Sequence, residues 1–519
     1  MSETAGQPIP REPEKDPGLG IEVATQWEGE PRHRLVTVGD SLTHGFQSGA
    51  IFNTDLSYPA VVAHELGWAD KFRYPTYAGY GGLPFNIELF LRDLEARFGQ
   101  DVNWWEVAPA LLHARRSMDK AEDYWERGPG SVVPAATAVN HNLAVFGWDL
   151  RDALEKSHAV CAGRIDAPKD QLLGQVVEHG DDRAALRVLP APPAAPDTLT
   201  QLTAAAHLGD ETGDTDPGHG IETLIVFLGA NNALSSVVDL KLVWSTDGEY
   251  RDLAKKGTFT VWRPAHFKAE LNRVAAQIRK VKARHVIWCT VPHVTIAPVA
   301  RGVSSKIELG SPYYPYYTRP WISDRDFDPT RDPHLTGEQA REIDGAIDHY
   351  NYAITDVVRK ARKAGKDWYL LDTAGLLDRL GSKRYIEDQQ ARPSWWTPYP
   401  LPPTLQALQP PPSTHFLAGD GERRTAGGLF SLDGVHPTTV GYGIIAQEVI
   451  NVMRLAGVPF FSPDGQTPRQ DPVLVDFERL VRRDTLINHP PGNLRSGLKI
   501  LAWADETLDL LSRVLRFGI

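Results

Sequence analysis

Short apolar runs, separated by long intervals, dominate the pattern of hydrophobic and polar positions. They lie at residues 33–38, 142–146, 223–228, 285–291 and 368–372. Runs of this length that end in turn-forming residues are typical of buried strands. Helical spacing of apolar residues follows at 58–66, 149–156, 265–283 and 335–364. The alternation predicts an α/β fold whose central parallel sheet has about five strands joined by right-handed crossovers.

The intervals between the predicted strands are too long for minimal α/β units, which indicates insertions. We expect them at about 70–138, 160–218, 297–334 and 382–428, where most of the proline, glycine and tryptophan lies. Residues 1–30 are polar and proline-rich and predict a disordered tail, because no basic segment there precedes an apolar one as in a signal peptide. The main domain is then expected at 31–457.

A helical extension is expected at 458–519, since leucines recur at helical spacing over residues 498–517. Packing on the main domain is the favoured role of this helix. Contact with a partner or with a membrane surface, as a peripheral attachment, is the alternative.

Composition narrows the class of protein. The chain has 519 residues, 42% of them hydrophobic and 23% charged, as in ordinary globular proteins. A formal charge of -11 without a dense Lys/Arg cluster argues against a nucleic-acid partner. Cys161 and Cys289 are far apart and predict neither a disulfide framework nor a zinc site. No run of about 18 uncharged apolar residues occurs, so we expect a protein without a transmembrane segment, cytoplasmic unless an export signal has been removed.

The first predicted strand ends on Gly39-Asp40-Ser41. In open parallel sheets ligands bind at the carboxyl ends of the strands, so this position suits a nucleophile. A serine hydroxyl needs a base to take its proton, normally a histidine held by a carboxylate. Taken alone, a serine after a strand is more commonly a helix N-cap.

Late in the chain, SLDGVHPTTVGYG places Asp433 and His436 three residues apart in a turn-rich loop. A helix is expected to follow from about Thr438 to Gly457. This loop is able to hold the imidazole against Ser41 while Asp433 accepts a hydrogen bond from the second ring nitrogen.

Four short blocks in this order resemble those of the SGNH, or GDSL, hydrolase family. The first is GDSL with Ser41, and the last is Asp-x-x-His with Asp433 and His436. The resemblance spans about residues 33–456 and implies a flavodoxin-like three-layer α/β/α fold. It also implies that Ser41, Asp433 and His436 form a catalytic triad, for whose chemistry no metal or organic cofactor is needed.

The two middle blocks bear on the oxyanion hole. NLAVFGWDL offers Gly147, and FLGANNAL offers Asn231. The resemblance implies that the backbone N–H groups of Ser41 and Gly147 and the side-chain amide of Asn231 stabilise the oxyanion. The third block of the family usually has an Asp where this chain has Asn232. We expect this difference to affect the conformation of that loop more than catalysis. Because position 43 is Thr, the chain lacks the Gly-x-Ser-x-Gly motif of α/β-hydrolases.

Two proline-rich aromatic loops follow the fourth and fifth predicted strands, SPYYPYYTRPW at 311–321 and RPSWWTPYPLPP at 392–403. Such loops are able to wall a pocket for an acyl chain or a sugar ring, or to pack as small clusters under their own backbone. The candidate pocket residues are His293, Tyr316, Trp321, Trp395 and Trp396.

These observations predict a serine hydrolase, esterase- or lipase-like, that cleaves carboxylic esters through an acyl-enzyme. Its expected partner is a small-molecule or lipid ester substrate. A carbohydrate O-deacetylase of the same family is the first alternative. A non-catalytic binding module on the same fold is the second, and the intact set of Ser41, Asp433, His436 and Asn231 argues against it.

Overall fold

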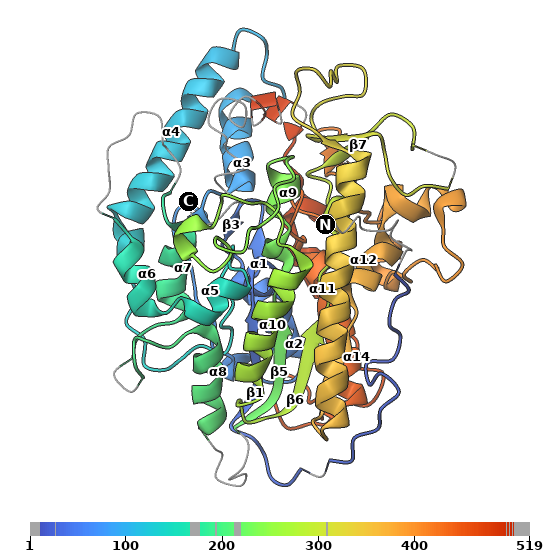
Figure 1. Cartoon of the computed structure of the whole chain (residues 1–519). Helices are drawn as coiled ribbons and strands as arrows, with labels where there is room; N and C mark the ends of the chain where they lie inside the picture. Colours follow the sequence, from blue (N-terminus) through green and yellow to red (C-terminus); the bar gives the residue numbers. More distant parts are fainter. Residues whose placement is uncertain are drawn as a thin grey trace.

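The structure, a computed structural model, describes residues 11–25, 27–166, 177–192, 195–211, 220–307, 310–494, 496–497, 499–500 and 502. Its core is a four-stranded parallel sheet in the order β1-β5-β6-β10, of which Figure 1 labels β1, β5 and β6. The four strands are β1 (His33–Gly39), β5 (Ile221–Phe227), β6 (Ala283–Cys289) and β10 (Trp368–Leu371). The predicted α/β class and parallel sheet are confirmed, and these strands match four of the five predicted runs to within two residues.

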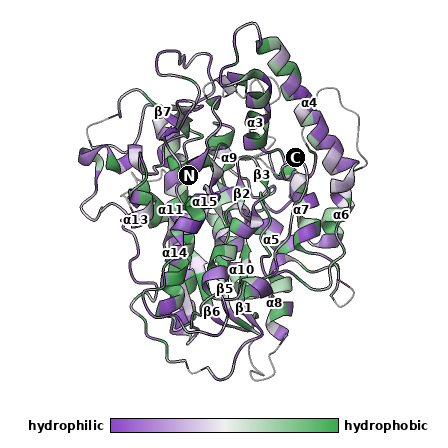
Figure 2. Cartoon of the chain, turned by 180° about the vertical axis from the view of Figure 1, so that it is seen from behind, coloured by the Kyte–Doolittle hydropathy of each residue, from purple (hydrophilic) through white to green (hydrophobic). Residues whose placement is uncertain are grey.

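The sheet forms the core because its strands are apolar on both faces, as buried parallel strands are. All seven residues of β5 are buried. The register pairs Val36 with Leu224 and Leu224 with Val286, so β-branched and leucine side chains form rows across the sheet. Figure 2 shows apolar residues concentrated in these strands, whereas peripheral helices such as α4 (Val107–Glu126) carry many polar ones.

The second predicted strand, at 142–146, is not formed as a strand. The segment lies beside β1, where Thr37 donates to the His141 carbonyl and accepts from Leu143, both at 2.9 Å, and a single parallel bridge joins Thr37 to Asn142. The Asn142 side chain accepts from the backbone N–H of Ala144, at 3.2 Å. Local side-chain bonds of this kind compete with a regular ladder, which explains the shortfall.

Helices surround the sheet, and the four helical segments predicted between the strands are found, although the one at 265–283 ends at Ile278. Helix α10 packs against α5, α8 and α11, and α14 packs against α2. The helix bounds are α1 (Ser41–His44), α2 (Tyr58–Glu65), α3 (Ile87–Phe98), α5 (Leu150–Glu155), α6 (His158–Arg164), α7 (Gly180–Val188), α8 (Gln201–Asp210), α9 (Ser235–Val238), α10 (Pro264–Ile278), α11 (Gly337–Lys363), α12 (Thr373–Leu380), α13 (Pro403–Gln406), α14 (Thr439–Leu455), α15 (Phe477–Arg483) and α16 (Thr485–Asn488).

Small antiparallel sheets lie outside the central one. They are formed by β2 (Phe46–Gln47), β3 (Ala50–Ile51) and β4 (Leu83–Pro84), by β7 (Arg301–Val303), β8 (Tyr316–Thr318) and β9 (Leu335–Thr336), and by β11 (Ala418–Gly419) and β12 (Arg424–Ala426). In the described part of the chain, none of the helices combines the length and the hydropathy of a membrane-spanning segment.

The chain before β1 is packed, at least from residue 11. Arg11 is buried and its guanidinium donates to both carboxylate oxygens of Asp372, at 3.0 and 2.8 Å. The N–H of Leu370 in β10 donates to the Pro17 carbonyl at 2.9 Å. The disordered tail predicted for residues 1–30 is therefore wrong for residues 11–25, because a buried ion pair holds them, and residues 1–10 lie outside the described part.

The extension after residue 457 is described up to residue 494 and at a few positions beyond it. Helix α15 packs against α14, where a Cβ on Gly443 would meet Leu480 Cδ1 at 2.4 Å. The helix predicted over 498–517, with its proposed contacts, lies almost wholly outside the described residues. The predicted boundary at 457 stays a prediction.

Candidate active site

The serine stands on a tight turn at the carboxyl end of β1. Asp40 caps the four-residue helix α1, its side chain accepting from the backbone N–H of Leu42 at 3.1 Å, and Ser41 is the first residue of that helix. A Cβ on Gly39 would lie 2.2 Å from Thr43 Oγ1 and 2.9 Å from the Phe227 carbonyl oxygen, so the turn accepts only glycine there. Helix α1 therefore presents Ser41 at the edge of the sheet where ligands bind.

A histidine from the far end of the sequence meets this serine. His436 Nε2 lies 2.8 Å from Ser41 Oγ, and His436 Nδ1 lies 3.1 Å from Asp433 Oδ2. When Nδ1–H donates to the carboxylate, Nε2 is left with a lone pair that accepts the serine proton. The structure thus brings together the three residues that the sequence singled out as a triad.

Asp433 is held by backbone donors as well as by the histidine. Its Oδ1 accepts from the N–H groups of Val435 and His436, both at 2.8 Å, and its Oδ2 accepts from Gly49 at 3.0 Å. Burial by itself raises the pKa of Asp433, but the charge of His436 and these hydrogen bonds outweigh it and lower the pKa below its ordinary value. The carboxylate is therefore ionised and fixed where it faces the imidazole.

The two residues predicted to complete an oxyanion hole lie in neighbouring loops. Gly147 has a φ of 75°, a conformation that glycine adopts without strain, and Asn231 lies in the 3₁₀ turn Ala230–Asn232 after β5. The Asn231 side-chain amide donates to the Trp148 carbonyl at 2.9 Å, which joins the two loops and leaves its second N–H available. Lys256 Nζ donates to the Gly147 carbonyl at 2.8 Å and thereby holds that turn from the other side.

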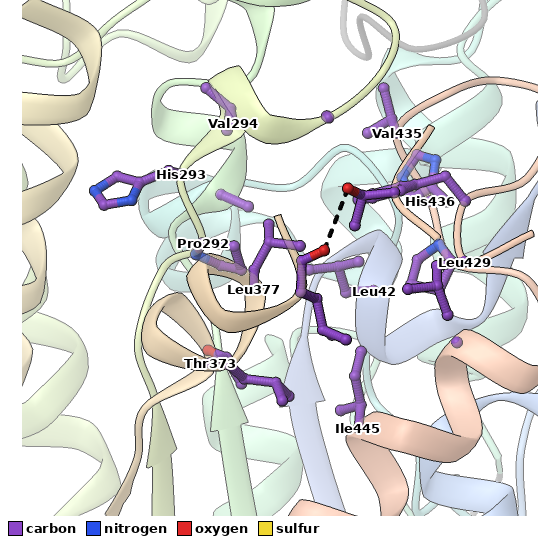
Figure 3. A pocket seen from close by; sticks show the side chains of 18 of the residues that line it. Leu42, Pro292, His293, Val294, Thr373, Leu377, Leu429, Val435, His436 and Ile445 are labelled. Carbon is purple, nitrogen blue, oxygen red and sulfur yellow. Dashed lines mark hydrogen bonds between the residues drawn. The ribbon is translucent and has the colours of Figure 1, made fainter. Parts of the chain in front are cut away.

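An apolar cavity of about 110 Å³ opens beside Ser41 and His436. Figure 3 shows Leu377 of α12 and Ile445 of α14 at this cavity, together with Leu42, Leu429 and His436. Among the lining residues are Phe227, Leu234, Val294, Ala297, Leu376, Leu377, Leu380, Phe430, Val435, Ile444 and Ile445. A cavity with this lining accommodates a hydrocarbon group next to the serine.

His293 lines this cavity, but its ring is turned away from it (Figure 3). The ring is bonded to two buried carboxylates, with Nε2 at 3.1 Å from Asp348 and Nδ1 at 3.2 Å from Asp378. Burial lowers the pKa of His293, but Asp378, Asp344 and Asp348 together raise it well above its ordinary value. The predicted substrate contact is thus not made by the imidazole, which is a member of a buried ion cluster.

The four aromatic residues predicted to wall the pocket lie elsewhere, and that prediction is corrected. Tyr316 contacts Phe327, with ring centroids 5.4 Å apart, and Trp321 packs at the margin of the main core. Trp396 is buried with Tyr385, its Nε1 donates to the Asp378 carbonyl at 3.0 Å, and Trp395 packs on the same cluster. These rings stabilise their own loops, because stiff proline-rich backbone buries its aromatic side chains locally.

A second Ser-His-Asp arrangement was not recognised in the sequence. Ser245 Oγ lies 2.8 Å from His266 Nδ1, and His266 Nε2 lies 2.7 Å from Asp247. Ser245 is fully buried, does not line the apolar cavity, and accepts a hydrogen bond from the backbone N–H of Arg263 at 2.9 Å. This arrangement fixes a loop and exposes no nucleophile. Of these two serines, Ser41 is the one that adjoins the apolar cavity.

The described residues include no group of three or more His, Cys, Asp or Glu side chains placed to hold a metal ion. A scan of the chain against protein-family models finds no match, and a search of curated proteins finds no relative. The geometry of Ser41, His436 and Asp433, together with the apolar cavity, is therefore the basis for assigning a function.

Proposed function

We propose that the protein is a serine hydrolase that cleaves carboxylic esters through an acyl-enzyme intermediate. One observation carries the proposal: Ser41 Oγ lies 2.8 Å from His436 Nε2 at the wall of an apolar cavity, with Asp433 on the other side of the imidazole. A serine, a base and an orienting carboxylate in this relation form the machinery of acyl transfer.

In the first half of the reaction, Ser41 Oγ attacks the ester carbonyl carbon and its proton passes to His436 Nε2. The tetrahedral intermediate then expels the alkoxide, which takes that proton from His436 and leaves as the alcohol, and Ser41 is acylated. In the second half, water gives a proton to His436 and attacks the acyl carbon, and Ser41 Oγ leaves and recovers the proton. Asp433 stabilises the imidazolium that forms in both halves.

Negative charge develops on the carbonyl oxygen in each tetrahedral intermediate, so fixed donors are needed beside Ser41. The proposed donors are the backbone N–H groups of Ser41 and Gly147 and the free N–H of the Asn231 side chain. The bond from Asn231 to the Trp148 carbonyl supports this role, because it places the amide in the loop next to Gly147.

The order of the sheet supports the proposed likeness to SGNH hydrolases. If the segment beside β1 that contains Asn142 is counted as a second strand, the spatial order reads 2-1-3-4-5, as in flavodoxin-like folds. Helices α10 and α11 pack as one pair and α2 and α14 as another, as expected for helix layers on the two faces of the sheet.

The lining of the cavity favours an acyl chain over a sugar ring. The side chains that line the cavity are mainly aliphatic, and the four aromatic residues predicted to wall the pocket are not among them. A carboxylic ester with an apolar acyl group, cleaved by an esterase or lipase-like enzyme, is therefore preferred to an O-acetylated carbohydrate.

The test combines a fluorophosphonate probe with 4-nitrophenyl esters of graded chain length, applied to the full chain and two variants. Ser41→Ala removes the proposed nucleophile, and Ser245→Ala removes the serine of the second Ser-His-Asp arrangement. The wild-type chain and Ser245→Ala are expected to react with the probe and to cleave the esters, whereas Ser41→Ala does neither.

Loss of labelling in Ser245→Ala but not in Ser41→Ala would place the nucleophile elsewhere. A folded wild-type chain that reacts with neither the probe nor any ester would overturn the hydrolase proposal and leave the non-catalytic binding module.

A further inference from the structure

A second cavity lies next to the apolar one, on the other side of Thr414. Its volume is about 260 Å³, and Thr414 lines both cavities. The side chains of Ser382 and Thr414 hold the partition in place, since Ser382 N donates to Thr414 Oγ1 at 2.8 Å and Thr414 N donates to Ser382 Oγ at 3.1 Å. The two spaces are thus neighbours with different linings.

The lining of this second cavity is cationic and more polar than that of the first. Arg301, Lys383 and Arg384 contribute to it together with Tyr314 and Tyr317, and the lining includes no Asp or Glu. The first cavity, by contrast, is lined mainly by aliphatic residues. A charged group fits the second cavity and not the first.

Two of the three cations already have a carboxylate partner. Arg384 is buried and its Nη2 donates to Asp344, which also accepts from the Tyr313 hydroxyl at 3.0 Å. Arg301 pairs with Asp324 through Nη1, but its Nε is buried and has no hydrogen-bond partner among the described residues. Arg301 lines the cavity and keeps one guanidinium N–H that the described protein atoms do not satisfy.

Lys383 is the cation without a partner. It is half-buried, and within the described part of the chain its ammonium group makes no ion pair or hydrogen bond. Burial lowers the pKa of Lys383, and the positive charge of Arg301 lowers it further, partly offset by Glu387 and Asp324. Glu387 is itself bonded to His415, and Asp324 to Arg301, so neither carboxylate neutralises Lys383.

We propose that this cavity is a binding site for a small oxyanion, a carboxylate or phosphate group, held by Lys383 and Arg301. An oxyanion accepts from the Lys383 ammonium and relieves its repulsion with Arg301. The inference goes beyond the proposed function, because the site is separate from the Ser41 cavity and stands whether or not the chain cleaves esters.

The test is calorimetric titration of the full chain with inorganic phosphate and, separately, with glutarate. Binding at one site is expected for at least one of them, and Lys383→Met is expected to weaken it by about tenfold or more, because it removes the unpaired charge. Lys383→Arg keeps the charge and is expected to bind within a few-fold of wild type. Lys280→Met, which removes an exposed lysine bonded only to Gln277, is the matched control.

Absence of saturable binding of both anions, or equal affinity in wild type and folded Lys383→Met, overturns the proposal. Lys383 makes no ion pair or hydrogen bond among the described residues, so Lys383→Met is expected to keep the wild-type melting temperature, and that measurement establishes that the variant is folded. This readout involves no ester, so its failure is distinct from failure of the hydrolase proposal.

Two aryl esters identify the source of the anion once binding is found. One has a neutral acyl chain, and the other has the same chain ending in a carboxylate. A preference for the second ester that disappears in Lys383→Met assigns the site to the anionic end of a substrate that reaches past Thr414. Equal cleavage of the two esters, with phosphate binding intact, assigns it to a free anion.

Discussion

The backbone amide of Phe146 donates to Nδ1 of His44 at 3.1 Å, and this bond fastens the helix that begins with Ser41 to the turn that contains Gly147. The other ring nitrogen of His44 lies 2.9 Å from the Tyr77 hydroxyl, which donates to the Ala184 carbonyl at 3.2 Å. Burial lowers the pKa of His44 to about 3, so the ring is neutral and Nδ1 accepts. The proposed nucleophile and the proposed oxyanion donor are thus positioned by one imidazole.

His44→Leu is expected to lower kcat for ester hydrolysis by about 10–100-fold, since small misplacements of a donor have effects of this size. His44→Asn keeps an acceptor near the position of Nδ1 and is expected to recover most of the rate. The measurement is kcat and KM for both variants. Wild-type kcat in His44→Leu, or an equal defect in both variants, contradicts the positioning role.

Asp433→Asn is expected to lower kcat by about 10³–10⁴-fold, because the amide no longer fixes the tautomer of His436 or stabilises its imidazolium. Asp420→Asn, an exposed position in an outer loop, is the control and is expected to be silent. Rates of ester cleavage and of fluorophosphonate labelling both report the change. A defect smaller than about tenfold means that Asp433 does not act on the histidine.

Ile445→Trp is expected to shorten the preferred acyl chain. Figure 3 shows Ile445 at the α14 side of the cavity, so an indole there fills space that a chain would use. We expect kcat/KM for long-chain esters to fall by about tenfold or more and that for acetate esters to stay within a few-fold. Ile386→Trp, at a position 41% exposed, is the control. An unchanged chain-length profile means that the acyl group binds elsewhere.

The buried carboxyl of Asp40 is expected to make the stability of the folded protein depend on pH. Burial raises the pKa of its carboxyl to about 7, although backbone hydrogen bonds from Leu42 and Ala230 counteract this. The folded state holds the proton to higher pH than the unfolded state, so wild-type stability falls as pH rises from about 4 to about 7. Asp40→Asn keeps an acceptor for Leu42 and cannot ionise, so it is expected to melt higher relative to wild type at pH 8 than at pH 5.

Thermal unfolding of both proteins at the two pH values measures this difference, with Asp70→Asn on the exposed 3₁₀ turn Ala69–Lys71 as the control. An equal offset between wild type and Asp40→Asn at both pH values shows that Asp40 does not change its ionisation on folding over this range.

The pattern of apolar residues predicted the strands of the central sheet well, because the burial of a parallel strand is visible in its own residues. The apolar runs that became β1, β5, β6 and β10 are buried on both faces, and no polar side chain within them competes with the ladder. The run at 142–146 has the same apolar pattern, but the Asn142 side chain accepts a hydrogen bond from the backbone N–H of Ala144. The sequence does not show which hydrogen-bond partner an asparagine takes.

The triad was predictable because Ser41, Asp433 and His436 each stand in a short, recognisable block. The pocket was not, because its walls depend on how α12 and α14 pack, and aliphatic residues at helical spacing look alike whether they face a cavity or the core. His293 illustrates the limit: its place after a strand was visible, but its carboxylate partners Asp348 and Asp378 come from helices 55 and 85 residues away.

Ser41 and His436 are 395 residues apart in the sequence, although their side chains touch. At the usual rate of about 5–20 residues per second, the ribosome reaches the histidine roughly 20–80 s after the serine. Throughout that interval the nascent chain carries the proposed nucleophile without the group that activates it. Synthesis itself therefore delays the onset of the proposed activity, and a translation product that ends before His436 is expected not to cleave esters.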